Sequence, residues 1–445
     1  MPITLRPDTF SLRHQLTALA VSITLCFGLS ACSKHEPASA ASPTAAAVKT
    51  AASAVAPSKD KDDVYEMQMK VQPNFKKMQA LGKDLFFDTN LSASGKMSCA
   101  SCHSPEFAFG PPNGLATQLG GSNMQTMGAR AVPSLRYQQN VPPFTEHHFD
   151  EDIDESIDQG AVGGHDWDGR APTLHAQSAL PLLAANEMAN ASEAEVVAKL
   201  RKASYADAFK DTFGAHALDD DHSAFKWATL ALEMFQQDPA LFYPYSSKYD
   251  AYLRKQTTLT AQEQRGLAVF NAKDKGNCAS CHVSRVSNLG AFPAFSDFGL
   301  IAVGVPRNNN LTINQEPNYY DLGACGPLRT DLKDKTQYCG AFRTPSLRNV
   351  ALRKTFFHNG QFHSLTQVIQ FYVSRDTNPA KWYPKNKDGS IHKYDDLPAA
   401  YHGNINLDPP FDRKLGDKPA LTDGEIRDMV AFLGTLTDGY QPPKK

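Results

Sequence analysis

The chain has 445 residues, of which 41% are hydrophobic and 21% are charged, and its formal net charge is −2. This composition excludes a disordered polyelectrolyte and disfavours a nucleic-acid binder that depends on a strongly basic surface. Only one apolar stretch approaches membrane length, and its position at the extreme N-terminus excludes a polytopic membrane protein.

Residues 1–31 have the pattern of an export signal, because basic residues precede an apolar run from Leu16 to Leu29. The segment ends in Leu-Ser-Ala-Cys, which resembles a bacterial lipobox and predicts a lipid anchor on Cys32. Ordinary signal cleavage is the alternative. Residues 32–65, rich in Ala, Pro and Ser, are predicted to be a flexible tether. We therefore expect a periplasmic lipoprotein that meets the membrane only through its lipid.

Three helices are predicted by apolar periodicity and by capping boxes. An amphipathic run covers Phe75 to Phe87. Capping boxes at Thr260 and Thr422 each begin an apolar-faced segment, the first leading through Phe270 and the second through Leu433. Strand signals are sparse. The sequence therefore predicts a mainly α protein with long loops and little sheet.

Two copies of the pattern C-x-x-C-H follow the first two predicted helices. They are Cys99-Ala-Ser-Cys102-His103 and Cys278-Ala-Ser-Cys281-His282. Two thiols at this spacing attach the vinyl groups of one porphyrin, and the next residue supplies the proximal imidazole of the iron. Thioredoxin-like pairs or half zinc sites are the alternatives, and the His that directly follows each pair disfavours both. We predict two covalently bound haems c.

The remaining cysteines, Cys325 and Cys339, lie in a loop with no His nearby. An oxidising compartment favours a disulfide between them. Closing this 15-residue loop would contribute about 3 kcal/mol in the chain-entropy model.

The repeated order of helix, haem motif and later helix predicts two cytochrome c-like domains, each with one covalent haem c. We place the domain of the first haem at 66–250 and the domain of the second haem at 251–445. The division falls near residues 240–258, before the second predicted helix.

From about residue 72 to 437 the chain resembles the bacterial di-haem cytochrome c peroxidases and their relative MauG. The matching strings are LGKDLFFD at 81–88, WDGRA at 167–171, DFG at 297–299, GVPRN at 304–308, FRTPSLRNV at 342–350 and FFHNG at 356–360. The resemblance implies that the domain at 66–250 is peroxidatic and that the domain at 251–445 transfers electrons. It implies that His103 and His282 are the proximal ligands. It also implies that Gln177 and Glu187 line the distal side of the first haem and that Trp167 lies between the haems.

The chemistry of peroxide cleavage supports a catalytic role for Glu187, because a proton must move from the inner to the outer oxygen of the peroxide and a carboxylate can transfer it. The amide of Gln177 does not titrate and can only orient the peroxide. Both could instead be ordinary helix-surface residues, and Trp167 could serve packing alone. In the peroxidases a methionine is the distal ligand of the second haem, and the corresponding position in this chain is Tyr372. MauG also has tyrosine there, so we predict that the phenolate of Tyr372 binds the iron of the second haem. A core aromatic is the alternative.

This chain differs from the family in two other features, the histidine that caps the first iron and the side-chain ligand of a calcium site. Between His103 and His147 the chain has no His to cap the first iron, so we expect an open iron, with Met124 as a less favoured ligand. An inter-haem Ca²⁺ is possible on carbonyls of Arg353 and Thr355, but the family's side-chain ligand, an Asn, is replaced by Ala131.

The predicted function is a periplasmic di-haem peroxidase that reduces hydrogen peroxide with electrons from a cytochrome c or another redox protein. One alternative is a MauG-like oxidase that modifies a Trp or Tyr of a partner protein. The other is a di-haem electron carrier without enzymatic activity.

Overall fold

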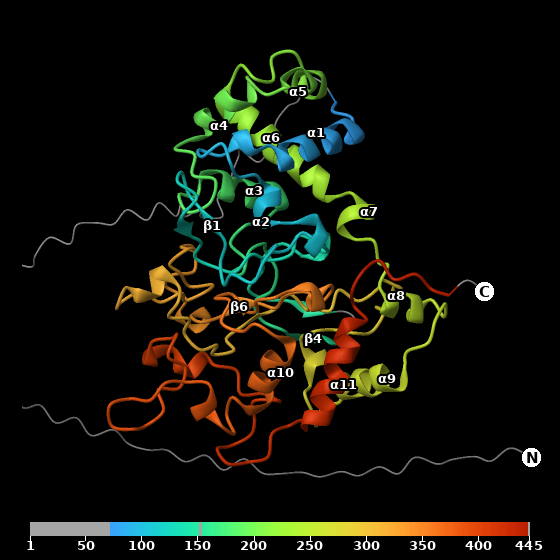
Figure 1. The fold of residues 1–445 in the computed structure, drawn as a ribbon, viewed down its shortest axis with the longest axis vertical. Helices are drawn as coiled ribbons and strands as arrows, with labels where there is room; N and C mark the ends of the chain where they lie inside the picture. Colours follow the sequence, from blue (N-terminus) through green and yellow to red (C-terminus); the bar gives the residue numbers. More distant parts are fainter. Residues whose placement is uncertain (1–71, 151–153, 444–445) are drawn as a thin grey trace, which may run out of the picture. The chain divides into compact units, whose positions relative to one another are not determined.

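The computed structural model describes residues 72–150 and 154–443. Within them, helices joined by long loops dominate, and sheet is limited to three two-stranded antiparallel ribbons (Figure 1). The mainly α expectation is therefore confirmed. The predicted signal peptide, the tether at 32–65 and Cys32 lie outside the described residues. The helices are α1 (Phe75–Phe87), α2 (Cys99–Cys102), α3 (Leu174–Leu183), α4 (Glu193–Leu200), α5 (Ala206–Phe213), α6 (Asp221–Gln236), α7 (Pro239–Phe242), α8 (Lys248–Leu253), α9 (Ala261–Asn271), α10 (Leu365–Ser374) and α11 (Asp423–Gly434).

The ribbons pair short strands that are close in sequence in two cases and distant in the third. Strands β1 (Leu119–Gly120) and β2 (Thr126–Met127) form one, and β3 (Phe149–Asp150) and β4 (Asp154–Asp158) form another. The third joins β5 (Leu300–Ile301) to β6 (Phe342–Arg343), and so brings the segments that follow the second haem motif together.

The three helices predicted from sequence form as expected. Helix α1 begins after Asn74, whose side chain accepts hydrogen bonds from the backbone N–H groups of Lys76 and Lys77. The boxes at Thr260 and Thr422 are complete, since each Thr caps the backbone of a Glu three residues later and that Glu bonds back.

Each haem motif is preceded by a helix that packs closely against a later one through a glycine. Helix α1 lies against α6, and α9 lies against α11 (Figure 1). A Cβ on Gly82 of α1 would stand 1.9 Å from the carbonyl oxygen of Ala231, and one on Gly266 of α9 would stand 2.1 Å from that of Asp428. Both helix pairs therefore require glycine at the contact.

The apolar core has two clusters of buried side chains. One contains residues between Met78 and Phe242 and surrounds the α1–α6 contact. The other contains residues between Tyr249 and Leu436 and surrounds the α9–α11 contact. Each haem motif has cysteines packed against one cluster, Cys99 and Cys102 against the first and Cys278 against the second.

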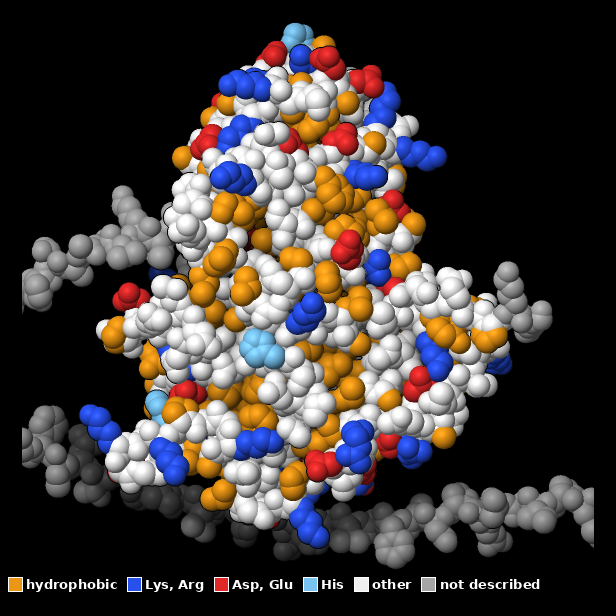
Figure 2. All heavy atoms as spheres, viewed as in Figure 1, with side chains coloured by type: hydrophobic (Ala, Val, Ile, Leu, Met, Phe, Trp, Pro, Cys, Tyr) orange, Lys and Arg blue, Asp and Glu red, His pale blue; other side chains and the backbone are white. Residues whose placement is uncertain are grey.

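On the face shown in Figure 2, basic and acidic side chains are interspersed with apolar patches. Among the helices of the described segments, none combines the length and apolar character needed to cross a bilayer.

Candidate active site

Each C-x-x-C-H motif lines a cavity, and the larger of these opens around the second motif with a volume of about 620 Å³. Cys278, Cys281 and His282 all line it, because a tight turn directs them to one side: the backbone N–H of His282 donates to the carbonyl of Cys278 at 2.8 Å. The imidazole Nδ1 donates to the carbonyl of Phe295 at 2.9 Å. This bond fixes the ring and leaves the Nε2 lone pair to bind a metal.

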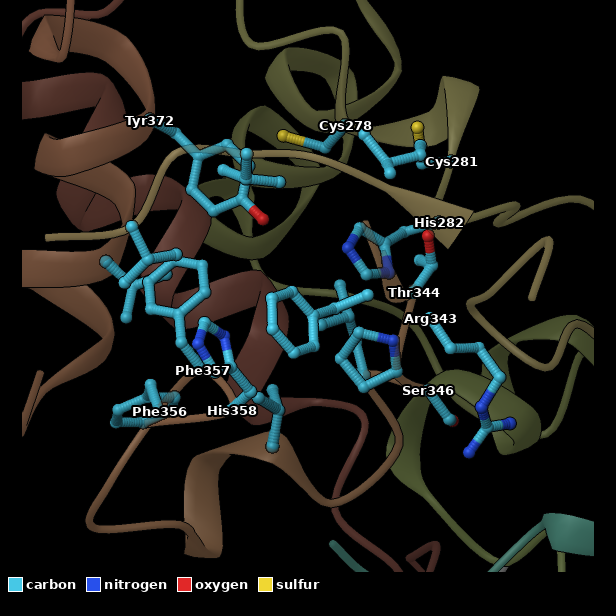
Figure 3. A pocket seen from close by; sticks show the side chains of 18 of the residues that line it. Cys278, Cys281, His282, Arg343, Thr344, Ser346, Phe356, Phe357, His358 and Tyr372 are labelled. Atoms are coloured by element: carbon cyan, nitrogen blue, oxygen red, sulfur yellow. The ribbon is translucent and has the colours of Figure 1, made fainter. Parts of the chain in front are cut away.

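Tyr372 enters the same cavity from α10. In Figure 3 its ring and the imidazole of His282 extend into the space from opposite sides. The tyrosine ring stacks between Phe357, at a centroid distance of 5.8 Å, and Phe411, at 5.4 Å. Its hydroxyl makes no hydrogen bond to the described residues. The packing therefore holds the phenol in place and leaves its oxygen free to bind a metal.

The walls of this cavity suit a flat apolar group with charged carboxylates. Its apolar lining comes from α9, α10 and α11, and its polar lining includes the guanidinium groups of Arg343 and Arg353. Burial lowers the pKa of both arginines to about 10. A porphyrin has an apolar ring and two carboxylates, so the cavity matches haem in its attachment thiols, its axial donors and its polarity. The main apolar lining residues are Phe270, Leu365, Val368, Ile369, Met429 and Leu433.

The smaller cavity, about 150 Å³, lies around the first motif. Cys99, Cys102 and His103 line it, and the N–H of His103 donates to the carbonyl of Cys99 at 2.9 Å. The Nδ1 of His103 donates to the carbonyl of Phe109 at 3.1 Å, in the same arrangement as His282. In this smaller cavity the match to haem lies in the two thiols and the imidazole, and the volume of the cavity contributes less to it.

Gln177 and Glu187 also line the smaller cavity. Gln177 comes from α3, and its Nε2 donates to Oδ1 of Asp166 at 3.2 Å. Glu187 follows α3 and is exposed to the open cavity that it lines. The protein atoms around the carboxyl still desolvate it and raise its pKa to about 7, with the negative charge of Asp166 adding to the shift. A carboxyl with this pKa can both accept and donate a proton near neutral pH.

Trp167 lines both cavities. Its indole Nε1 donates to the carbonyl of Ala131 at 2.7 Å, and its own carbonyl accepts from the N–H of Arg343, also at 2.7 Å. One bond fixes the indole and the other fixes the backbone of Trp167, between the two C-x-x-C-H motifs.

A buried ionic network anchors the segment that contains Trp167. Asp168 is fully buried and pairs with Arg130 at 2.8 Å and with Arg170 at 3.1 Å. Burial would raise the pKa of Asp168, but the two guanidinium groups prevail and lower it to about 2. Arg130 also pairs with Asp321 at 2.7 Å, which connects this network to the C-terminal half of the chain.

The structure also bears on Met124, the alternative ligand of the first haem, and on the region of the possible calcium site. Met124 is absent from the lining of the smaller cavity, and its sulfur accepts a hydrogen bond from the hydroxyl of Ser94 at 3.3 Å. In the proposed calcium region, Nε of Arg353 donates to the carbonyl of Thr355 at 3.2 Å. The predicted Cys325–Cys339 disulfide is confirmed.

The folded chain thus brings the predicted residues into two groups joined by Trp167. Cys99, Cys102, His103, Gln177 and Glu187 share the smaller cavity, and Cys278, Cys281, His282 and Tyr372 share the larger. Sequence reasoning missed the side chains of Asp166, Arg343 and Arg353, and it considered Arg353 only for its backbone carbonyl. The first two lie beside or inside the strings that carry the resemblance, and that position is the one signal that could have indicated them.

Comparison with known proteins identifies several relatives. The model of the family described as "Di-haem cytochrome c peroxidase" matches residues 76–258. The methylamine utilization protein MauG of Paracoccus denitrificans (strain Pd 1222) is 34% identical over 376 residues, which cover 82% of this chain and 90% of that protein. The cytochrome c551 peroxidase of Nitrosomonas europaea is 27% identical over 377 residues, 84% of each chain.

Among solved structures, the crystal structure of the di-haem peroxidase BthA from Burkholderia thailandensis E264 is similar, with a TM-score of 0.73 and 38% sequence identity. The match covers 85% of this chain and 89% of that one. The crystal structure of a MauG-like protein associated with microbial copper homeostasis has a TM-score of 0.57 and 26% identity, over 84% of this chain and 93% of that one.

Proposed function

The chain belongs to the di-haem cytochrome c peroxidase family, and on this basis we propose that it reduces hydrogen peroxide with electrons from an external redox protein such as a small cytochrome c. It is an oxidoreductase of the haem peroxidase class. The observation that carries the proposal is the pair of Cys-Cys-His cavities that both include Trp167 in their lining, the smaller of which is also lined by Glu187, whose carboxyl pKa is raised to about 7.

The family implies two haem c groups. Cys99, Cys102 and His103 would hold one, and Cys278, Cys281, His282 and Tyr372 would hold the other. When bound, these groups supply iron centres that react with peroxide and store oxidising equivalents. The Tyr372 oxygen is a hard anionic ligand when deprotonated and favours oxidised iron.

Glu187 is proposed as the proton carrier of the peroxidatic site. Its carboxylate accepts a proton from the incoming peroxide and returns it to the departing oxygen, which leaves as water. The amide of Gln177, oriented by its bond to Asp166, positions the peroxide. Trp167 provides the path for electrons between the two haem sites, since it lines both cavities.

The smaller cavity is proposed to be open on the side opposite His103. Among its described lining residues, His103 is the one histidine, and Met124 is engaged elsewhere. We therefore expect the protein to react with peroxide without prior reduction of the second haem.

Several finer assignments rest on sequence alone. We propose that residues 66–250 form the peroxidatic domain and 251–445 the electron-transfer domain, a division that falls between the two core clusters. We also propose a periplasmic location with an anchor at Cys32.

Inter-haem Ca²⁺ remains a prediction of the resemblance. The carbonyl of Thr355 already accepts from Arg353, and Ala131 supplies no side-chain oxygen. Any calcium must therefore bind weakly, and we expect treatment with the chelator EGTA to leave the haem spectra unchanged.

A MauG-like role is the second candidate, favoured by the 34% identity to MauG and by Tyr372. In that role the electrons would come from a Trp or Tyr side chain of a partner protein. A peroxide-dependent change in that partner's mass would identify it.

The proposed peroxidase activity is tested by steady-state oxidation of reduced cytochrome c in the presence of peroxide. Protein that carries both haems should oxidise the cytochrome at a rate that depends on both substrates. Fully loaded protein that fails to do so, and whose resting spectrum has no high-spin component, would be a non-enzymatic electron carrier.

A further inference from the structure

Arg353 is a cation in the wall of the larger cavity, and part of its guanidinium group has no hydrogen-bond acceptor among the described residues. It follows the short turn at Val350–Leu352, and its Nε donates to the carbonyl of Thr355 at 3.2 Å. Its Nη2 is buried without a hydrogen-bond partner among the described residues. A buried guanidinium in this state is costly unless an anion completes its bonding.

Arg353 is half-buried as a residue, and three arginines that are more deeply buried have such an anion within the protein. Arg348 pairs with Asp250 at 3.0 Å, and Arg375 pairs with Asp376 at 2.7 Å. Arg329 pairs with Asp331 at 2.8 Å. Arg353 forms no ion pair with a carboxylate of the described residues, and burial alone shifts its pKa. The described part of the chain therefore supplies no compensating charge, which points to a bound anion.

Arg343, the other arginine that lines this cavity without an ion pair, is already engaged. Its Nε donates to the carbonyl of Asp166 at 3.2 Å and its Nη2 donates to Oε1 of Gln138 at 3.3 Å. The negative charges of Asp166 and Asp168 also act on it. Arg353 is thus the better candidate for a bound anion.

The position of Arg353 also relates it to the smaller cavity. Its Nη1 lies 3.9 Å from the point that a Cβ on Gly110 would occupy. Gly110 directly follows Phe109, whose carbonyl accepts the hydrogen bond from His103. The guanidinium therefore lines one haem cavity and borders the loop that orients the proximal histidine of the other.

We propose that Arg353 binds a carboxylate of the haem attached at Cys278 and Cys281. This inference rests on the proposed function, since it requires that haem to be present. We choose a haem carboxylate because haem is the group expected in this cavity and its carboxylates carry negative charge. A carboxylate also accepts hydrogen bonds in a geometry that matches a guanidinium group. A positive charge at this place stabilises the reduced haem relative to the oxidised haem, and so raises its reduction potential.

The test compares three variants by spectroelectrochemistry, after a pyridine haemochrome assay has counted the haems. Arg353→Gln removes the charge, and Arg353→Lys keeps it. Lys354→Gln is the matched control, because Lys354 is the adjacent cation, is exposed, and is absent from the lining of both cavities, although it packs over the ring of Phe107 at 5.0 Å. We expect Arg353→Gln to lower the equilibrium constant for reduction of the second haem about tenfold, which is about 59 mV for one electron. Arg353→Lys should recover most of this loss, and Lys354→Gln should change the constant less than twofold.

An unchanged potential in Arg353→Gln, or an equal fall in Lys354→Gln, would overturn the proposal. A crystal structure of the haem-loaded wild-type protein gives a reading that does not depend on how well the variants fold. A guanidinium nitrogen should lie within hydrogen-bond distance of a haem carboxylate oxygen, whereas an inorganic anion or only water at Nη2 would contradict it. Absence of haem from the wild-type protein would instead refute the proposed function.

Discussion

Nε2 of Gln177 donates a hydrogen bond to Oδ1 of Asp166 at 3.2 Å, and the other carboxylate oxygen of Asp166 pairs with Arg170 at 2.8 Å. Asp166 therefore connects two side chains that line the smaller cavity. Its negative charge also raises the pKa of Glu187, which burial already elevates. One aspartate thus affects both the orientation of the amide and the protonation of the proposed proton carrier.

Replacing Asp166 by Asn should move the acidic limb of the pH profile. If Glu187 acts as a carboxylate, kcat/KM of the wild type falls as the pH drops below about 7. Asp166→Asn removes a charge that raises this pKa, and frees Arg170, whose charge lowers it. The acidic limb should therefore shift to lower pH, as measured by kcat/KM for peroxide between pH 5 and 8. A limb that stays in place or moves upward would exclude this electrostatic role.

Glu187→Gln removes the titrating group while keeping its shape. We expect kcat/KM for peroxide to fall by about 10²–10⁴-fold, the range typical of general acid–base catalysis, with both haems retained. Glu193→Gln is the control, because Glu193 lies in the first turn of α4 and pairs with His222 at the surface. If the two variants lose similar activity, Glu187 has no special role in catalysis.

Gly82→Ala should destabilise the protein although alanine is the better helix former. The added Cβ would stand 1.9 Å from the carbonyl oxygen of Ala231, so α1 must move away from α6. Overpacking of this kind costs about 1–3 kcal/mol, against a helix-propensity gain of about 1 kcal/mol. Gly434→Ala is the matched control, since it also lies in a helix and a Cβ there meets no atom within 4 Å. Thermal unfolding should show a lower midpoint for Gly82→Ala and an equal or higher one for Gly434→Ala. Equal effects would mean that the α1–α6 contact is not glycine-dependent.

Sequence patterns predicted the local elements well, because their determinants are local. The span of α1 and the capping boxes at Thr260 and Thr422 depend on residues within one or two turns. The thiol and imidazole positions of each haem motif are likewise fixed by five consecutive residues. These features could be recognised before any tertiary contact was known.

Other features depend on contacts between distant segments. The bond between Asp166 and Gln177 and the ionic link from Asp168 through Arg130 to Asp321 join residues that no local pattern pairs. The lone cation of Arg353 is notable only because no carboxylate of residues 72–150 or 154–443 pairs with it in the folded chain. The roles proposed for Tyr372 and Glu187 came from a family spacing, since a single aromatic residue or a single carboxylate has no distinctive sequence signal of its own.

The most direct test of the account is the electron paramagnetic resonance spectrum of the resting ferric protein, compared with that of Tyr372→Phe. The wild type should give one high-spin signal, from an open iron beside His103, and one low-spin signal, from an iron bound by His282 and Tyr372. The variant should keep the high-spin signal of the first haem and lose or change only the low-spin one. A wild-type spectrum without a high-spin signal, or a low-spin signal that survives the substitution unaltered, would contradict the proposed difference between the two sites.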